Sequence, residues 1–363
     1  MGETISLVMI VKNEADTLER CLKSALSYVD EIIIVDTGST DNSKQIASEF
    51  GAVIFDFEWG GDFSEARNYA LSKSTSQWNL VLDADEYISN ICKEEIIKFI
   101  NYSEPSIGKI RIVNKFRSKD GINYEQIYIS RLFPSSIRYA GRIHEQVISN
   151  LPRRIIDIEV QHDGYYERKK SSRNIPLLAK EIDENPYDPY YYYQIAKEYR
   201  GLGDHEQAHE QLKVSYQLIT RKEVYAPSLI VNYLYAMIES GYLAEGLDVV
   251  ENERLFLKDY ADFFFVSALY LQELIMCNPV QFSEMLPLIE RYYLEALKIG
   301  ETGKEGSVSG AGSFAAHHNL GVFYEVTGDI KNAKAQYRKA AAYEYEPSKD
   351  RLIEFSKTLP HNN

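Results

Sequence analysis

The stretch Leu80-Val81-Leu82-Asp83-Ala84-Asp85-Glu86 leads an apolar run directly into two carboxylates that lie two residues apart. Short apolar runs of this kind predict a buried strand, here over residues 78–82, which is expected to end at Asp83. Two acidic groups at a strand end cost free energy unless a cation or hydrogen-bond donors neutralise them, as a divalent metal bridging a diphosphate does. Taken alone, the pattern also fits a solvated acidic turn that caps the following helix.

The residues around this stretch alternate between strand-like and helix-like segments. Apolar runs at 5–11, 32–35 and 52–55 predict three further strands, and apolar residues recur at helical spacing over 18–26 and 63–71. Strands that alternate with short helices predict an α/β domain with a doubly wound, mostly parallel sheet. Ligands of such sheets bind beyond the carboxyl ends of the strands, so the polar residues at those ends are the candidates for a site.

Polar residues are associated with more than one of the predicted strands. Asp36 follows the run at 32–35, and Asp62, Arg67 and Asn68 lie in the segment before Asp83. A nucleotide that crosses the edge of the sheet requires polar groups on successive strands. Asp36 can instead be the N-cap of the helix that follows it. Three β-rich segments, at 109–113, 127–133 and 155–161, are expected to complete the same domain.

The composition changes after residue 164, where tyrosine becomes frequent and the periodicity stays helical to the end of the chain. We therefore expect two domains, at 1–168 and 169–363. A pattern over residues 192–212 recurs over 320–340, with Gly203 matching Gly328 and Ala208 matching Ala333, and a weaker copy surrounds Gly241. These offsets are typical of tetratricopeptide repeats of roughly 34 residues, so the second domain is predicted to be an all-α helical-repeat domain.

The bulk properties exclude several classes of function. The net charge of −14 opposes binding to a nucleic-acid polymer, although a bound cation can still attach a single nucleotide. The longest apolar runs are far shorter than a membrane span, and no secretory signal precedes the first strand, so we expect a cytoplasmic protein. The three cysteines are widely spaced and indicate neither a disulfide framework nor a zinc site.

Several motifs together resemble those of family 2 glycosyltransferases, which have the GT-A fold. They are Met9-Ile10-Val11-Lys12-Asn13-Glu14, Val35-Asp36-Thr37-Gly38-Ser39-Thr40-Asp41, Ala66-Arg67-Asn68, Asp83-Ala84-Asp85 and Gly141-Arg142-Ile143-His144-Glu145-Gln146. The resemblance implies a UDP-sugar donor, UDP-glucose or UDP-GlcNAc, with Asp36 bonding the uracil or ribose, Arg67 the base and Asp83 the ribose. The donor-binding residues that it implies are Val11, Asn13, Glu14, Asp36, Arg67, Asp83, Ala84 and Asp85.

The resemblance also implies a metal ion and a catalytic base. Asp85 is expected to ligate Mn²⁺ or Mg²⁺ beneath the diphosphate together with a late histidine, for which we favour His162 over His144. Enzymes of this family generally invert the anomeric centre, which requires a base on the acceptor side, and Glu145 is the candidate. Glu145 can alternatively orient the sugar or Arg142, and a thiol acceptor needs little help from a base.

Two arginines near these motifs are left open. Arg131 and Arg142 can each hold phosphate or pair with the many carboxylates of the domain, and the sequence does not separate these roles. A nucleotidyltransferase would share the doubly wound sheet, but it is expected to carry a Gly-rich phosphate loop after the first strand, which residues 11–14 lack.

The architecture bears on the acceptor. Tetratricopeptide arrays form concave surfaces that bind peptides or further subunits, so we expect a peptide or glycan acceptor, or a homodimer formed through the repeats. The combination resembles bacterial peptide S-glycosyltransferases that modify glycocins on Cys and sometimes on Ser. It also resembles less specific transferases of spore-surface and cell-envelope glycans. A non-catalytic scaffold that acts through its repeats is the alternative of a different class.

Overall fold

In the computed structural model the chain is described over residues 3–91, 93–102, 104–118, 121–162, 171–302 and 307–357. It divides into two compact units, Met1–Asp183 and Glu184–Asn363. The division falls at the end of helix α5 (Ser171–Glu184), whereas the change of composition places the boundary at residue 168. Helix α5 packs with the first unit because its buried Glu181 pairs with Arg142 and its Leu177 lies beside Gly61.

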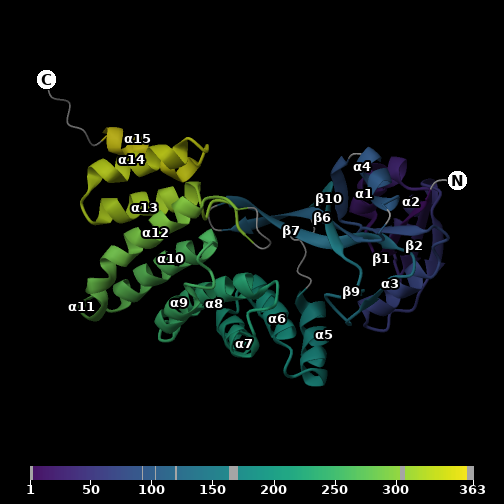
Figure 1. Ribbon diagram of the computed structural model, residues 1–363, viewed down its shortest axis with the longest axis horizontal. Coiled ribbons are helices and arrows are strands. Elements are labelled where there is room, and N and C mark those ends of the chain that lie inside the picture. Colours follow the sequence, from purple (N-terminus) through teal and green to yellow (C-terminus); the bar gives the residue numbers. More distant parts are fainter. Residues whose placement is uncertain are drawn as a thin grey trace. The chain divides into compact units, whose positions relative to one another are not determined.

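An eight-stranded sheet forms the middle of the first unit (Figure 1). Its order is β3-β2-β1-β4-β7-β6-β10-β5. The first four strands are parallel, β7 is antiparallel to β4 and β6, β10 is parallel to β6, and β5 is antiparallel to β10. The strands are β1 (Ile5–Val11), β2 (Glu31–Asp36), β3 (Val53–Asp56), β4 (Trp78–Val81), β5 (Glu86–Ile91), β6 (Ile107–Ser118), β7 (Gly121–Pro134) and β10 (Arg153–His162). The predicted α/β fold with a mostly parallel GT-A sheet is confirmed.

Helices cover both faces of this sheet (Figure 1). Leu7 and Met9 of β1 are buried with Leu18 on one face, whereas Val8 is buried with Leu71 on the other. The strand is therefore continuously apolar, as expected when both faces of a sheet are covered. The first face carries α1 (Ala15–Ala25), α2 (Ser43–Glu49) and α4 (Lys93–Ile100), and the second carries α3 (Phe63–Leu71) with the small sheet of β8 (Arg138–Ala140) and β9 (Gln146–Ile148). A 3₁₀ turn at Leu26–Tyr28 extends α1.

The strand ends that matter for a ligand meet at one edge of the sheet. Val11 lies opposite Asp36, and Asp36 lies opposite Asp56. Further along the sheet, His162 at the end of β10 lies opposite both Asn114 of β6 and Glu86 of β5. Polar residues that are distant in the sequence are therefore neighbours at this edge, which is where ligands of open α/β sheets bind.

The second unit is helical and its helices form antiparallel pairs. Gly203, Gly241 and Gly328 end the first helices of three pairs with φ of 79°, 77° and 88°. Glycine adopts this left-handed conformation without strain, and so it stops each helix and starts the turn. The predicted repeats and the weaker copy around Gly241 are confirmed. The helices are α6 (Pro189–Leu202), α7 (His205–Leu218), α8 (Ala226–Ser240), α9 (Gly246–Glu253), α10 (Ala261–Cys277), α11 (Pro279–Phe282), α12 (Leu286–Ile299), α13 (Phe314–Val326), α14 (Ile330–Ala341) and α15 (Glu346–Lys357), with a 3₁₀ turn at Ser283–Met285.

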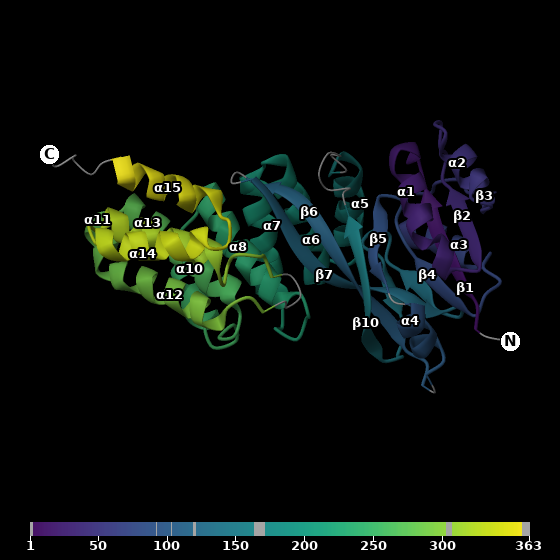
Figure 2. The same ribbon diagram turned by 90° about the horizontal axis from the view of Figure 1, so that it is seen from above.

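One continuous core runs from α6 to α13. Helix α10 packs against both α8 and α12, and α13 packs against α12 and α14, so neighbouring pairs stack as in a repeat array (Figure 2). Tyr233 of α8, Tyr270 of α10 and Tyr293 of α12 are fully buried in this core, which explains the frequency of tyrosine in this half. In the part of the chain that the structure describes, no helix is both long and apolar enough to span a membrane.

Candidate active site

Asp36, the last residue of β2, is almost fully buried, with 1% of its surface exposed. Its Oδ1 accepts hydrogen bonds from the backbone N–H groups of Gly38 (3.0 Å) and Ser39 (2.8 Å). Its Oδ2 is buried and accepts no hydrogen bond from the described residues. Helix α2 begins only at Ser43, so the alternative that Asp36 is a helix N-cap is wrong. An acceptor buried without a partner is costly, so Asp36 is suited to receive an N–H or O–H group of a ligand.

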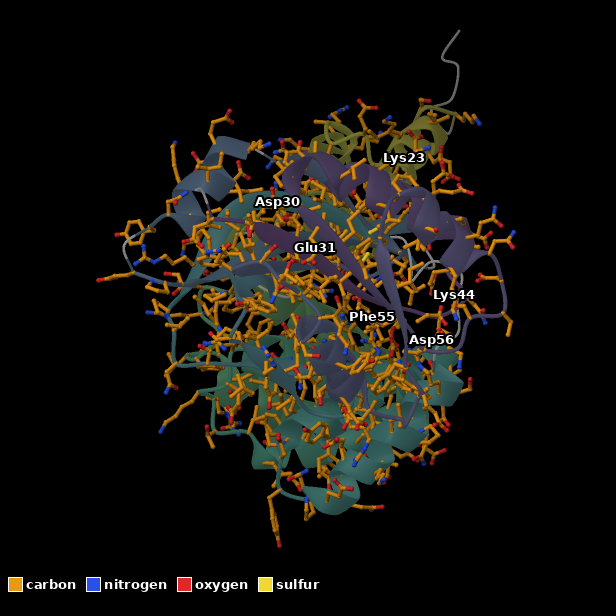
Figure 3. The ribbon with its side chains drawn as sticks, turned by 90° about the vertical axis from the view of Figure 1, so that its right-hand side faces the viewer. Lys23, Asp30, Glu31, Lys44, Phe55 and Asp56 are labelled. Atoms are coloured by element: carbon orange, nitrogen blue, oxygen red, sulfur yellow. The ribbon has the colours of Figure 1, made fainter. Side chains whose placement is uncertain are left out.

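A second carboxylate and a lysine lie beside Asp36. Lys44 Nζ is 3.7 Å from Asp36 Oδ1, and it forms an ion pair with Asp56 at the end of β3 (Figure 3). One lysine is thus shared between two carboxylates at neighbouring strand ends. The remaining negative charge at this end of the edge favours a ligand that arrives with a cation.

The loop after β1 is tied to the loop after β2. Asn13 has a positive φ of 54°, and its side-chain Oδ1 accepts a hydrogen bond from the backbone N–H of Thr40 (2.7 Å). The N–H of Asn13 donates to Ser39 Oγ (2.9 Å), and the N–H of Glu14 donates to Ser43 Oγ (2.8 Å). The first two site loops therefore form one rigid platform next to Asp36.

Asp83 lies directly beyond β4 and is held by two arginines. Its Oδ1 accepts from Nη2 of Arg67 on α3 (2.7 Å), and its Oδ2 accepts from Nη2 of Arg131 on β7 (2.8 Å). Arg67 also donates from Nε to Glu145, in the loop between β8 and β9, and Arg131 donates to Glu86 (2.8 Å). These charged side chains come from separate elements and form one network with Asp83 at its centre.

The network keeps Asp83 ionised and leaves several buried donors without a partner among the described residues. The pKa of Asp83 is well below its ordinary value, because the charges and hydrogen bonds of Arg67 and Arg131 outweigh the burial that acts to raise it. Nη1 of Arg67 and the hydroxyl of Tyr139 are buried and have no hydrogen-bond partner among the described residues. A guanidinium N–H without an acceptor beside Asp83 is suited to a carbonyl oxygen of a ligand.

Asp85 approaches His162 at the same edge. Asp85 Oδ1 lies 3.5 Å from His162 Nε2, and the other ring nitrogen, Nδ1, lies 2.8 Å from Asn114 Oδ1. The pKa of His162 is raised, because the hydrogen bond and negative charge of Asp85 outweigh the burial that acts to lower it. The structure thus brings together the two residues that were predicted to ligate a metal.

This pair fits the ligand set of a divalent cation. Two ligands at about 2.1 Å from one octahedral ion lie about 3.0 Å apart when adjacent, which is near the observed spacing. The bond between Nδ1 and Asn114 orients the ring with Nε2 toward Asp85, as is usual for a ligating histidine. No three His, Cys, Asp or Glu side chains within the described ranges are placed to hold a metal together. The fit therefore requires further oxygen ligands, such as those of a diphosphate or water.

The sequence places this site within a known family. Residues 6–152 match the model of glycosyl transferase family 2. These residues are a family 2 glycosyltransferase domain. The residues Asp36, Arg67, Asp83, Asp85 and Glu145 all lie inside the matched range, whereas His162 lies beyond it. The resemblance inferred from the motifs is confirmed, for the family 2 domain and for the helical region that follows it.

Two curated relatives and one solved structure are similar to parts of the chain. A TPR repeat-containing protein of Synechococcus elongatus is 32% identical over 204 residues, which are 51% of this chain and 50% of that protein. Glycosyltransferase SunS of Bacillus subtilis, derived from the SPbeta prophage, is 27% identical over 277 residues, which are 69% of this chain and 63% of SunS. Glucosyl-3-phosphoglycerate synthase of Mycobacterium tuberculosis, solved with Mn²⁺, UDP and glucosyl-3-phosphoglycerate, aligns with 31% of this chain and 44% of that chain at 23% identity and a TM-score of 0.26. The chain spans about half to two thirds of the length of the two curated relatives.

Within the family 2 domain Arg131 and Arg142, whose roles the sequence left open, both pair with carboxylates. Arg131 pairs with Asp83 and Glu86, whereas Arg142 pairs with Glu181 of α5 (3.3 Å), which also accepts the backbone N–H of Arg142 (3.0 Å). Glu145 contacts Arg67, and not Arg142 as one alternative held. His144 precedes Glu145 in the same loop with a positive φ of 52°, and it is His162 that meets Asp85.

Three residues of the site were not among the predicted ones. Glu86 belongs to the stretch 80–86 quoted above, but its role depends on Arg131, which reaches it from strand β7. Tyr139 is clamped to α3 by Asn68, which bonds both its N–H and its C=O at 2.9 Å. Asn114 has no sequence signal of its own, since only the pairing of β6 with β10 places it beside His162.

Proposed function

We propose that this protein is a glycosyltransferase that moves a sugar from a UDP-sugar, UDP-glucose or UDP-GlcNAc, to an acceptor with inversion of the anomeric centre. The observation that carries the proposal is the arrangement at the carboxyl edge of a family 2 domain. There Asp36, the Asp83–Arg67 pair and the Asp85–His162 pair lie at the ends of β2, β4 and β10. A nucleotide diphosphate that binds along this edge would contact, in order, the hydrogen-bond acceptor Asp36, the hydrogen-bond donor Arg67 and the proposed cation site.

In this proposal the nucleotide is held by groups that now lack a partner. Asp36 Oδ2 accepts an N–H of the uracil or a ribose hydroxyl, and Arg67 Nη1 donates to a carbonyl oxygen of the base. Asp83, fixed by its two arginines, accepts the ribose hydroxyls. The platform of Val11, Asn13 and Glu14 supports the base, and Ala84 passes beneath the diphosphate between the two carboxylates.

Asp85 and His162 hold Mn²⁺ or Mg²⁺ in this proposal. When bound, such an ion neutralises the diphosphate and so makes it a better leaving group. The protein's own contribution is to hold the carboxylate and the imidazole at the spacing that one ion needs, with Asn114 orienting the ring. The two arginines around Asp83 keep this carboxylate ionised, and Asp83 lies two residues before Asp85. The chain therefore supplies negative charge near the proposed ion.

Glu145 is the proposed base, and the proposed acceptor is a Cys or Ser of a polypeptide. The carboxylate of Glu145 forms an ion pair with Arg67, and a carboxylate can accept the proton of an acceptor hydroxyl that lies within reach. The stacked helix pairs of the second unit suit a polypeptide, and this combination of domains resembles the glycocin S-glycosyltransferases. Glycans of the cell envelope or spore surface are the alternative acceptors.

Calorimetric titration of the whole chain tests the donor and the cation. UDP, UDP-glucose and UDP-GlcNAc are titrated with Mn²⁺ present and then with EDTA. We expect binding that requires the metal and that falls at least about tenfold in Asp85→Asn, because a ligand of the cation is lost. The matched control is Asp56→Asn, which changes a carboxylate of the same edge that is exposed and lies outside the cation pair. Equal binding by Asp85→Asn and the unaltered protein would contradict the proposal that Asp85 ligates a metal. No binding in any condition would favour the non-catalytic scaffold.

A further inference from the structure

A hollow of the first unit lies away from the carboxyl edge, where the sheet is irregular. Strand β10 pairs with β6 at 153–155 and again from Glu159, and between them the register slips, so that residues 156–158 form a bulge. A further irregularity interrupts β6 against β7 between Gly108 and Lys109. Bulges bend a strand and redirect its side chains, and they are retained next to binding sites. The hollow of about 500 Å³ opens at this bulge, between the bulged strands and α4.

The hollow is well separated from the proposed donor site. Arg154 lines it near the start of β10, whereas His162 ends the same strand eight residues later, and at about 3.3 Å per residue this corresponds to roughly 26 Å of extended strand. Its volume falls within the range of sites that hold a small ligand, about 300–1,000 Å³.

The walls of the hollow combine aromatic rings with paired charges. Tyr102, which is 52% exposed, and Tyr128 line it, and the guanidinium of Arg154 lies 4.3 Å from the ring centroid of Tyr102. Ile155, 66% exposed, adds an apolar surface that no part of the described chain covers. The aromatic and aliphatic surfaces are open to a ligand, and the cation contact fixes the orientation of one ring.

Each cationic side chain that lines the hollow is paired with a carboxylate of the protein. Arg111 pairs with Glu159 at 2.6 Å, Arg154 pairs with Glu104 at 3.3 Å, and Lys98 pairs with Glu95 at 2.8 Å. An anionic ligand would have to compete with these carboxylates, so the hollow does not favour a phosphate. The guanidinium and carboxylate groups of these pairs can still form further hydrogen bonds, in fixed directions, with a neutral ligand.

We propose that this hollow is a binding site for a neutral oligosaccharide of two or three sugar units. A sugar ring presents an apolar C–H face, which suits Tyr102 and Tyr128, and a rim of hydroxyls, which suits Arg111, Arg154 and Asp157. The site is distinct from the donor site and does not depend on the activity proposed above. It gives the family 2 domain a means of holding a glycan chain independently of the nucleotide sugar.

Saturation-transfer NMR and calorimetry on the full chain, with maltotriose and chitotriose as the probes, test this site. We expect at least one trisaccharide to bind with Kd on the order of 1 mM. Tyr102→Ala and Arg154→Met are each expected to weaken binding about tenfold, since each removes a wall of the hollow. Both side chains are partly exposed, so the variants are expected to fold, which circular dichroism verifies. Tyr124→Ala, at an exposed tyrosine of β7 outside the hollow, is the matched control and retains binding.

The remaining arms separate this site from the donor site and from an anion site. Asp85→Asn is expected to bind the trisaccharide as the unaltered protein does, because Asp85 lies beside His162, at the opposite end of β10 from the hollow. The proposal is overturned if neither trisaccharide binds, if Tyr102→Ala and Arg154→Met bind unchanged, or if Asp85→Asn abolishes binding. It is also overturned if uridine monophosphate, and not a trisaccharide, shows binding that Arg154→Met removes.

Discussion

At the scale of single residues, the site depends on charges that satisfy one another. Asp83 is bonded by Arg67 and Arg131, Glu86 also accepts the backbone N–H of Asp83 (2.9 Å), and Glu145 closes the other end on Arg67. Glu86 and the two arginines are almost fully buried, and buried charges are tolerated only when paired and hydrogen-bonded. The same network that positions Asp83, the carboxylate proposed to bind the ribose, is therefore expected to contribute to stability.

Replacing Arg131 by methionine tests this dual role. Arg131→Met leaves Glu86 buried and unpaired and removes one partner of Asp83, so we expect the first unit to lose about 3 kcal/mol. Both tryptophans of the chain, Trp59 and Trp78, lie in this unit, so their fluorescence during denaturant unfolding reports it selectively. Arg154→Met is the control and should cost under about 1 kcal/mol, because its pair with Glu104 is exposed. Similar losses in both variants would contradict the account of Arg131.

Glu145→Gln tests whether this residue is a base. With a synthetic peptide whose acceptor is Ser, we expect kcat/KM to fall about 10²- to 10⁴-fold, because the hydroxyl must lose its proton in the reaction. With a matched peptide whose acceptor is Cys, the fall should stay under about tenfold, since thiolate forms near neutral pH. Transfer is measured by mass spectrometry, and Glu181→Gln, which removes a carboxylate paired with Arg142, is the control. Equal losses on both peptides would assign Glu145 an orienting role.

At the scale of elements, side chains that cross between helices hold the repeat pairs together. Glu245 precedes α9, accepts a hydrogen bond from Tyr233 of α8 (3.0 Å) and pairs with Lys213 of α7. The bond from Lys213 lowers the pKa of Glu245, burial opposes this, and the bond from Tyr233 adds to it. One carboxylate thus connects three successive helices.

Glu245→Gln should therefore destabilise the second unit in a pH-dependent way. A carboxyl group with a lowered folded pKa stabilises the fold above its ordinary pKa of about 4.3, and this contribution is lost as pH falls through the folded value. We expect a deficit of about 1 kcal/mol at pH 7, small because Glu245 is half exposed, that disappears near pH 3. Thermal unfolding followed by circular dichroism measures it, with the exposed Glu284→Gln as control. A deficit that persists unchanged at low pH would refute the ionic origin.

At the scale of the whole molecule, the two units have separate cores. The core of the second unit runs from Tyr193 to Leu320, whereas the cores on the two faces of the sheet are built from residues between Ile5 and Val160. Units with their own cores unfold as separate transitions unless they are strongly coupled. Tryptophan fluorescence and the helical circular dichroism signal should thus report different transitions.

Gly246→Ala separates the two transitions. A Cβ at Gly246 would lie 2.2 Å from the ring of Tyr270, which is fully buried and bonded through its hydroxyl to Leu243 O (2.6 Å). We expect a loss of about 2 kcal/mol in the transition seen by circular dichroism and no shift in the tryptophan transition. Gly201→Ala, in a helix with open space around it, should be neutral or slightly stabilising. A parallel shift of both signals would show that the units unfold together.

Much of this fold follows from local patterns. The strands β1, β2, β3 and β4, helix α3 and the repeats with Gly203 and Gly328 are predicted within a residue or two, because periodicity and turn glycines act over short distances. Strands β5, β8 and β9 and helix α4 were missed. β8 and β9 are three residues each, and β5 is defined by its pairing with β10 rather than by an apolar run.

By itself the sequence determined the family, the alternation of strands and helices, and the carboxylates that end the strands, since these are properties of neighbouring residues. Only the tertiary structure decided that Arg131 pairs with Asp83 and Glu86, that Asp85 lies beside His162, and that Arg142 pairs with Glu181. It also decided where β10 bulges beside the hollow next to α4. The physical reason is that each of these contacts joins segments far apart in the chain, and sheet register and packing select the partner among many available charges.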